Sequence, residues 1–167
     1  MSKAVLISIR PKWCEKIING DKTIEVRKTR PKIDTPFKCY IYCTLPKYPH
    51  EDFIATDYPR PQFYGGGKVI GEFTCERIAL IAYDGGELSS TTNAAFSPAT
   101  CLTQSEIIAY IGDKGRCYGW HMSNLRIYDT PRELSEFTGL RNTRFGAAPY
   151  DIKRAPQSWC YVEEVRA

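Results

Sequence analysis

The segment from Gly20 to Arg27 (GDKTIEVR) brings an ammonium, a carboxylate and a guanidinium close together in the sequence. Lys22 is a compact cation with three donors, suited to binding a phosphate or to polarising a carbonyl. Glu25 and Arg27 are two positions apart, so on a β-strand they share one face with Thr23. There an arginine can donate two hydrogen bonds to a phosphate, and a glutamate can accept one from a base amino group. The segment therefore predicts a site for a phosphate or a base.

If the strand is regular, the Lys22 side chain points to the opposite face, because neighbouring strand residues alternate sides. It joins the face only if the strand starts irregularly, which the preceding Gly20-Asp21 pair permits. A simpler interpretation also stays open, in which Glu25 and Arg27 form only a surface ion pair worth ~0–1 kcal/mol.

Binding of unpaired nucleic acid needs cations for the phosphates and flat side chains on which bases stack. The first part of the chain supplies such cations at Arg10, Lys12, Lys16, Lys28, Arg30 and Lys32. A later segment offers three stacking candidates, Tyr118, Trp120 and His121. Strand alternation places His121 on the face opposite to the other two. Each tryptophan can instead be a core residue, and for Trp13 and Trp159 we expect this because their surroundings are apolar.

Positive charge is concentrated at the start of the chain. Residues 1–38 contain ten Lys and Arg against four Asp and Glu, whereas the remainder contains thirteen against fifteen. The overall charge of +4 is thus a local +6 followed by a local −2. This asymmetry favours a polyanionic partner, and the alternative is that these charges only solvate the surface.

Composition excludes several classes of protein. A chain of 167 residues with 43% hydrophobic and 25% charged residues is expected to form one globular domain. Its longest apolar run, residues 78–83, is far shorter than the ~20 residues of a membrane-spanning helix, and the N-terminus does not resemble a signal peptide. Seven cysteines without a CxxC pair indicate reduced thiols, and two isolated histidines predict no metal site. We expect a cytoplasmic protein without a metal or other cofactor.

Hydrophobic patterns predict strands at residues 4–9, 22–28, 39–43, 67–81, 116–128 and 158–165, with a bulge or bend at Gly71. Helices are expected at 11–19, at 103–111 and at 132–137. The second and third begin with capping-box spacing, at Thr103 and at Thr130. Irregular stretches are expected at 45–66, 84–99 and 139–157. Strands without regular βαβ alternation indicate an α+β domain on a mainly antiparallel, barrel-like sheet.

The strand–helix–strand context of the first segment, with Gly20, Lys22, Glu25 and Arg27 in the pattern G-x-K-x-x-E-x-R, resembles the ASCH domain of the PUA-like superfamily. Residues 118–137 and 156–164 resemble the bacterial and prophage branch of that family. The resemblance implies a small mixed or antiparallel β-barrel flanked by short helices. It covers both ends of one domain spanning residues 1–167 but not the stretches 45–66 and 84–99, which are expected to be loop insertions.

The resemblance also implies a function: binding of RNA, or of a modified base, nucleotide or nucleoside, in a cleft lined by the G-x-K-x-x-E-x-R strand. Cleft residues would be Lys22, Glu25 and Arg27, with backbone contacts from the basic N-terminal segment.

A second hypothesis comes from a branch of the family that hydrolyses the amide of N4-acetylcytidine. This chain resembles that branch at Lys22 but carries Glu25 where the branch has a threonine nucleophile. An amidohydrolase here, or another hydrolase that processes nucleic acid, would use Lys22 with Glu25 as general base. Its acidic partner would be Glu72 or Glu106, and His121 is a spare acid or base.

A third hypothesis treats the domain as a scaffold for protein interaction. Residues 45–66 are rich in aromatic residues and proline, a composition that suits a surface for a partner protein.

Overall fold

The computed structural model describes residues 2–45, 53–55, 62–64 and 66–166. The predicted strands are present as β1 (Lys3–Ile9), β2 (Ile24–Arg27), β3 (Phe37–Cys43), β6 (Lys68–Tyr83), β8 (Arg116–Arg132) and β11 (Trp159–Glu163). Two predicted helices are present as α1 (Pro11–Ile18) and α2 (Gln104–Ile111). The further elements are short: β4 (Phe53–Ala55), β5 (Gln62–Tyr64), β7 (Leu88–Ser90), β9 (Thr138–Thr143), β10 (Gly146–Asp151) and 3-10 turns at Asn93–Phe96, Pro98–Thr100, Gly112–Lys114 and Leu134–Glu136.

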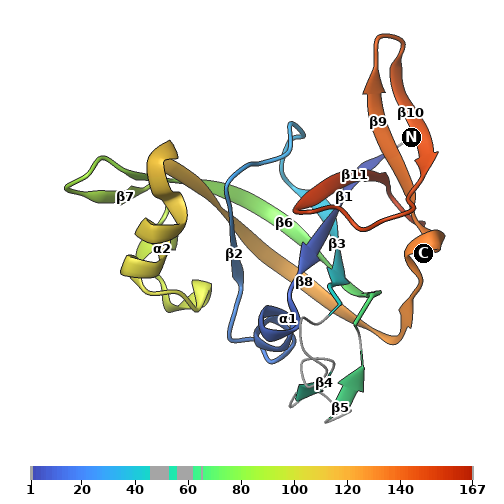
Figure 1. Cartoon of the computed structure of the whole chain (residues 1–167), viewed down its shortest axis with the longest axis horizontal. Helices are drawn as coiled ribbons and strands as arrows, with labels where there is room; N and C mark the ends of the chain where they lie inside the picture. Colours follow the sequence, from blue (N-terminus) through green and yellow to red (C-terminus); the bar gives the residue numbers. More distant parts are fainter. Residues whose placement is uncertain (1, 46–52, 56–61, 65, 167) are drawn as a thin grey trace.

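The main sheet has the order β10-β9-β11-β1-β3-β6-β8-β2, with β7 paired to β6. The pair β1–β3 is parallel and the other pairs are antiparallel. The sheet curls around α1, but its end strands β2 and β10 are not paired with each other, so the barrel stays open (Figure 1). The predicted α+β, barrel-like fold is confirmed in this open form.

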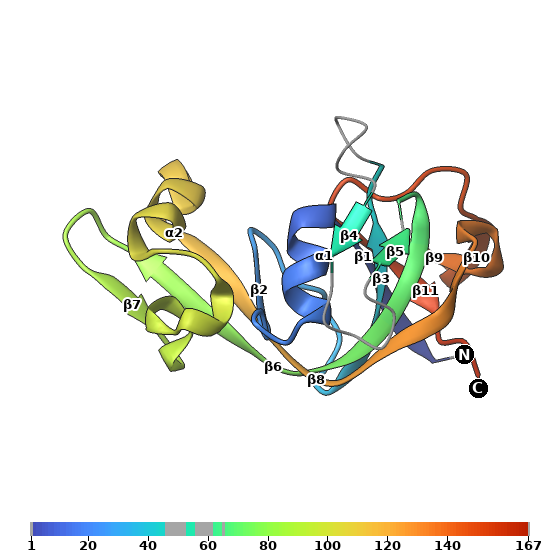
Figure 2. The same ribbon diagram turned by 90° about the horizontal axis from the view of Figure 1, so that it is seen from below.

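The longest strands, β6 and β8, run side by side across the molecule and carry α2 and β7 beyond one end of the barrel (Figure 2). Their pairing shifts register between Val69 and Gly71, next to the glycine at which a bulge was predicted. A Cβ atom at Gly71 would lie 2.5 Å from the Arg126 carbonyl oxygen, so the two backbones approach too closely for a side chain.

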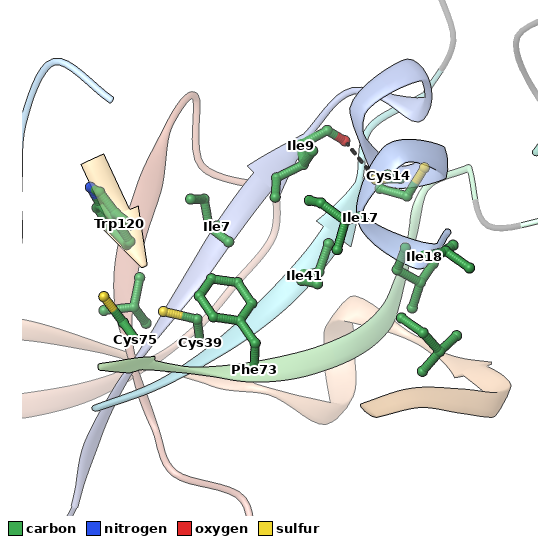
Figure 3. Close-up of a cluster of buried hydrophobic side chains, with 14 of the residues drawn as sticks. Ile7, Ile9, Cys14, Ile17, Ile18, Cys39, Ile41, Phe73, Cys75 and Trp120 are labelled. Atoms are coloured by element: carbon green, nitrogen blue, oxygen red, sulfur yellow. Dashed lines mark hydrogen bonds between the residues drawn. The ribbon is translucent and has the colours of Figure 1, made fainter. Parts of the chain in front are cut away.

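The main core lies between α1 and the concave face of the barrel (Figure 3). Ile17 of α1 packs with Ile7 of β1 and Ile41 of β3, all of them fully buried or nearly so. The Cys14 thiol donates to the Ile9 carbonyl oxygen across 3.5 Å, which ties α1 to the end of β1. All seven cysteines are free, and five are buried, consistent with the predicted reduced thiols.

The prediction is wrong at residues 132–137. β8 continues to Arg132, and only one 3-10 turn follows, closed by reciprocal bonds between Glu133 and Glu136 rather than by Thr130. The predicted irregular stretch 139–157 is also wrong at its start, because β9 and β10 pair as a hairpin. The Tyr150 ring covers Gly139 and fills the place where a side chain would be, so this glycine belongs to a strand and does not end a helix.

The stretch 84–99 contains β7 and most of two 3-10 turns, so it is more regular than predicted. Most of the stretch 45–66 lies outside the described residues, apart from the two-stranded sheet β4–β5, and its proposed role as a partner surface stays a prediction. Within the described residues, no helix has the length and apolar character needed to cross a bilayer.

Candidate functional site

A pocket of about 800 Å³ opens beside β2, which runs between α1 and α2 (Figures 1 and 2). Four predicted site residues line it, namely Arg10, Lys22, Glu25 and Arg27. Its other walls come from Ser8 and Thr44 at the ends of two strands, from Trp13 of α1, and from Leu102, Glu106 and Tyr110 in and before α2. The basic N-terminal segment and α2, some 80 residues apart in the sequence, thus face each other across the pocket.

The turn after α1 sets the position of Lys22. Gly20 has a φ of +83°, a conformation that favours glycine and reverses the chain at the helix end. The Lys22 amide then donates to the Lys16 carbonyl (3.0 Å), and the Thr23 amide donates to the Ala99 carbonyl (2.9 Å). Lys22 therefore precedes the regular strand, and its side chain reaches the same pocket as Glu25 and Arg27, as the irregular strand start predicted.

Lys22 is a buried cation, only 2% exposed. Its Nζ donates to the Thr100 carbonyl oxygen at 2.6 Å and lies 4.9 Å from the centroid of the Trp13 ring. Burial lowers the pKa of this ammonium, and the nearby Glu25 carboxylate opposes part of that change. The pocket thus holds a lysine that releases its proton more readily than an exposed one.

Glu25 is also buried, at 6% exposed. Its Oε1 accepts from the Val26 amide (3.1 Å) and lies 3.4 Å from the Arg27 Nε, whereas its Oε2 has no hydrogen-bond partner among the described residues. A buried acceptor without a partner costs ~1–3 kcal/mol or more, and a ligand donor that reaches it recovers this energy. Glu25 is therefore the group in the pocket most in need of a ligand.

Arg27 bridges the gap that the open sheet leaves beside β2. Its Nη2 donates to the Ser8 carbonyl oxygen of β1 (2.7 Å), and its Nη1 donates to the Ser158 hydroxyl (3.3 Å) just before β11. With its Nε beside Glu25, all three guanidinium nitrogens thus have partners within the protein, and its side chain is only 14% exposed. The expected pair of hydrogen bonds from the Arg27 guanidinium to a phosphate does not fit this arrangement. Arg27 instead holds the pocket wall in position.

The structure separates the remaining predicted residues from the pocket. Trp120 is fully buried and packs edge-on against Phe37 and Trp159, so it belongs to the core. His121 lies on the opposite face, as predicted, where its Nε2 is 3.0 Å from the Thr92 hydroxyl and burial lowers its pKa. Neither residue lines the pocket, and their contact with a ligand stays a prediction.

Three further candidates, Thr23, Lys12 and Tyr118, do not line the pocket either. Thr23 and Lys12 are exposed beside it, and the Lys12 ammonium lies 4.7 Å from the centroid of the Trp13 ring. Tyr118 lines a second hollow, together with the residues that directly follow β2.

Of the two carboxylates considered as the acidic partner for hydrolysis, Glu72 and Glu106, only Glu106 lines the pocket. Glu72 pairs with Lys38 (2.8 Å), accepts from the Tyr128 hydroxyl (3.2 Å) and does not line the pocket. Glu106 does line it, while its carboxylate also accepts from the Thr103 amide and completes the predicted capping box.

Sequence reasoning missed Trp13 and Tyr110 as pocket residues. Trp13 was assigned to the core, yet it is only half-buried and lines the pocket. Tyr110 lies four residues, about one helical turn, after Glu106 of the predicted capping box, and burial raises its pKa. Only the folding of α2 against β2 brings these two rings to one hollow. Among the described residues, no group of three or more His, Cys, Asp or Glu side chains could hold a metal ion.

No protein-family model matches the sequence, and no curated protein matches it either. Solved structures are similar in fold. The ASCH protein from Zymomonas mobilis aligns with a TM-score of 0.59 and 18% identity over 96% of this chain and 88% of that chain. A Tyr-to-Phe mutant of that protein aligns with a TM-score of 0.60 and 18% identity over 98% of this chain and 92% of the other. The chain therefore has the ASCH fold, as the sequence motif predicted.

The Arg27 bridge has a measurable effect on stability. Replacing Arg27 by lysine leaves one ammonium that cannot reach both Ser8 and Ser158, so we expect Arg27→Lys to lower the free energy of unfolding by about 2 kcal/mol. Urea denaturation measures this change. The same substitution at Arg126, whose side chain is 64% exposed, is the control and should change stability by less than about 0.5 kcal/mol. Equal losses of unfolding free energy at both positions would contradict a stabilising role for the Arg27 hydrogen bonds.

The lowered pKa of Lys22 predicts a pH dependence of stability. Between that pKa and the unfolded value of about 10.4, the unfolded chain binds more protons than the folded one, so stability rises with pH. Lys22→Met removes this contribution, and the stability of the wild type relative to the variant should increase as the pH rises towards 10. The tyrosines titrate in both the wild type and Lys22→Met, so their contribution cancels in the difference between the two stabilities. Parallel stability curves for the wild type and Lys22→Met would disprove the assignment.

Proposed function

We propose that the pocket binds a nucleobase, carried by RNA or by a modified nucleotide, and that the protein is a nucleic-acid-binding module. The observation that carries this proposal is the buried Oε2 of Glu25, which has no hydrogen-bond partner among the described residues, in a pocket that the buried Lys22 also lines. A base presents N–H donors next to carbonyl acceptors on one edge. Glu25 can accept from such a donor, and Lys22 can donate to such an acceptor.

The size and walls of the pocket agree with this ligand. A volume of about 800 Å³ is within the range of small-molecule sites, which are mostly apolar with a few polar groups that fix orientation. Trp13 and Tyr110 are flat side chains on which a base can stack. Arg10 lines the pocket and is exposed, in a position to contact a phosphate attached to the ligand.

The fold alone does not decide the function, because one fold serves many functions. It nevertheless agrees with the resemblance stated from the sequence, since the ASCH family is expected to bind RNA. Glu25 and Lys22, two of the motif positions that carry the resemblance, are also the buried charges of the pocket.

The Glu25 carboxylate should prefer a base that offers an amino group. Cytidine monophosphate presents an amino group where uridine monophosphate presents a carbonyl oxygen, which repels a carboxylate. We expect calorimetric titration to give about tenfold tighter binding of the cytidine nucleotide. Glu25→Gln should abolish most of this preference, because an amide can accept or donate.

The matched control is Glu163→Gln, the same change on β11 outside the pocket, which should preserve the preference. Absence of nucleotide binding at millimolar concentration, or an unchanged preference in Glu25→Gln, would contradict the proposal.

A second candidate function is hydrolysis of an N4-acylated cytidine. The lowered pKa of Lys22 beside the free oxygen of Glu25 favours it. Glu25 would take a proton from water, the resulting hydroxide would attack the acyl carbon, and Lys22 would stabilise the oxyanion before the proton passes to the departing amine. Glu106 is the further carboxylate in the pocket.

Incubation with N4-acetylcytidine, followed by ultraviolet absorbance, tests this activity. Turnover by the wild type that is lost in Lys22→Met would support it. Absorbance changes no faster than those with the Lys22→Met variant would eliminate it and leave the binding function.

A further inference from the structure

A second hollow of about 790 Å³ lies past the C-terminal end of β2. One of its walls is the segment 28–34 that connects β2 to β3, and the other is the start of β8 with the residues before it. We call this hollow the basic groove. It is lined by Lys28, Thr29, Arg30, Pro31, Lys32, Ile33, Asp34, Lys114, Arg116 and Tyr118.

The basic groove carries five cations against one carboxylate, that of Asp34. The five cationic residues are all exposed, and in the described part of the chain none of them forms an ion pair. Elsewhere, Lys38 and Lys68 pair with Glu72 and Glu133. A hollow that gathers unpaired cations at this density attracts a ligand with several negative charges.

The segment that forms one wall is fixed to the barrel. The Trp159 indole donates to the Thr29 hydroxyl (3.0 Å), and the Lys32 amide donates to the Tyr161 hydroxyl (2.7 Å). Both partners lie on β11, so the cations of this segment are presented by an anchored turn. On the opposite wall, the half-buried ring of Tyr118 is a flat surface among the charges. Proteins bind unpaired nucleic acid with cations that contact the phosphates and aromatic rings on which the bases stack.

The basic groove and the pocket meet at Lys28. This residue lines the groove, and its Nζ lies 5.1 Å from the centroid of the Tyr110 ring, which lines the pocket. The preceding residue, Arg27, lines the pocket as well. A strand whose base occupies the pocket can therefore continue past Lys28 into the groove.

We propose that the basic groove binds the phosphodiester backbone of a single-stranded nucleic acid, so that the ligand of this protein is an oligonucleotide rather than a free nucleoside. The proposal rests on the proposed function of the pocket, which receives one base of the same strand. A single strand is required because a base in a duplex is stacked and paired, and its edge cannot enter the pocket. The phosphates on one side of that base then face Lys28, Arg30, Lys32, Lys114 and Arg116.

Binding of fluorescent RNA and DNA oligonucleotides of one to eight nucleotides, measured by anisotropy in about 50 mM salt, tests the groove. For the wild type we expect affinity to rise with length. The double variant Lys114→Gln and Arg116→Gln should keep its affinity for a mononucleotide but lose about tenfold or more for the octamer. Its plot of log affinity against log salt should be shallower by about 0.7 for each lost phosphate contact.

The matched control is Lys153→Gln with Arg154→Gln, which removes the same charge from exposed positions outside the groove and should bind the octamer as the wild type does. Three results would contradict the proposal that the groove binds the backbone of a single strand. They are an affinity that does not depend on oligonucleotide length, an equal loss of affinity in the control variant, and equally tight binding of duplex RNA. The same titrations with RNA and with DNA oligonucleotides show which of the two backbones the groove binds. If mononucleotides fail to bind while the octamer still depends on Lys114 and Arg116, the pocket proposal fails and the groove stands.

Discussion

A single guanidinium holds together the part of this protein in which its candidate sites lie. The main sheet ends at β2, and no backbone ladder joins β2 to the barrel on the side of β1 and β11. Arg27 spans that gap through Ser8 and Ser158, while its Nε lies beside the Glu25 carboxylate. The same side chain thus ties the strand to the barrel and lies beside the Glu25 carboxylate. Lysine cannot replace it, because only a planar fork of donors reaches partners on two different strands.

Burial of charged groups around β2 is costly, and the hydrogen bonds of the site offset only part of that cost. Lys22 donates to one carbonyl oxygen and lies against a ring, and Glu25 accepts from one amide. The Glu25 Oε2 remains without a partner among the described residues. A fold that served stability alone would fill this place with apolar side chains. The basic groove is different, because its cations are exposed and hydrated and contribute charge at little cost to folding.

Local signals predicted the elements of the site well, and tertiary packing decided the rest. Gly20, the period-two pattern of β2 and the Thr103 capping box each depend on neighbours within a few residues, and all three are present as expected. Trp13 packs against the main core, as expected, but it is only half-buried and also lines the pocket. Trp120, for which the sequence left stacking and core roles open, is fully buried. The hairpin β9–β10 depends on the Tyr150 ring over Gly139, a contact between two strands that the spacing of residues did not reveal.

The two long strands β6 and β8 have a consequence for how such a protein can change its ligand. They form a ribbon that extends beyond the barrel, and α2, which forms one wall of the pocket, is carried at its far end (Figure 2). At this end β2 pairs with β8 and β7 pairs with β6, so the ribbon is edged by two further strands. Ile107 and Ile111 of α2 pack in one apolar cluster with Ile24 of β2, and none of these three side chains lines the pocket. The width of the pocket therefore depends on apolar residues outside its lining, and substitutions there can change the size of ligand that fits while the charges around β2 stay the same.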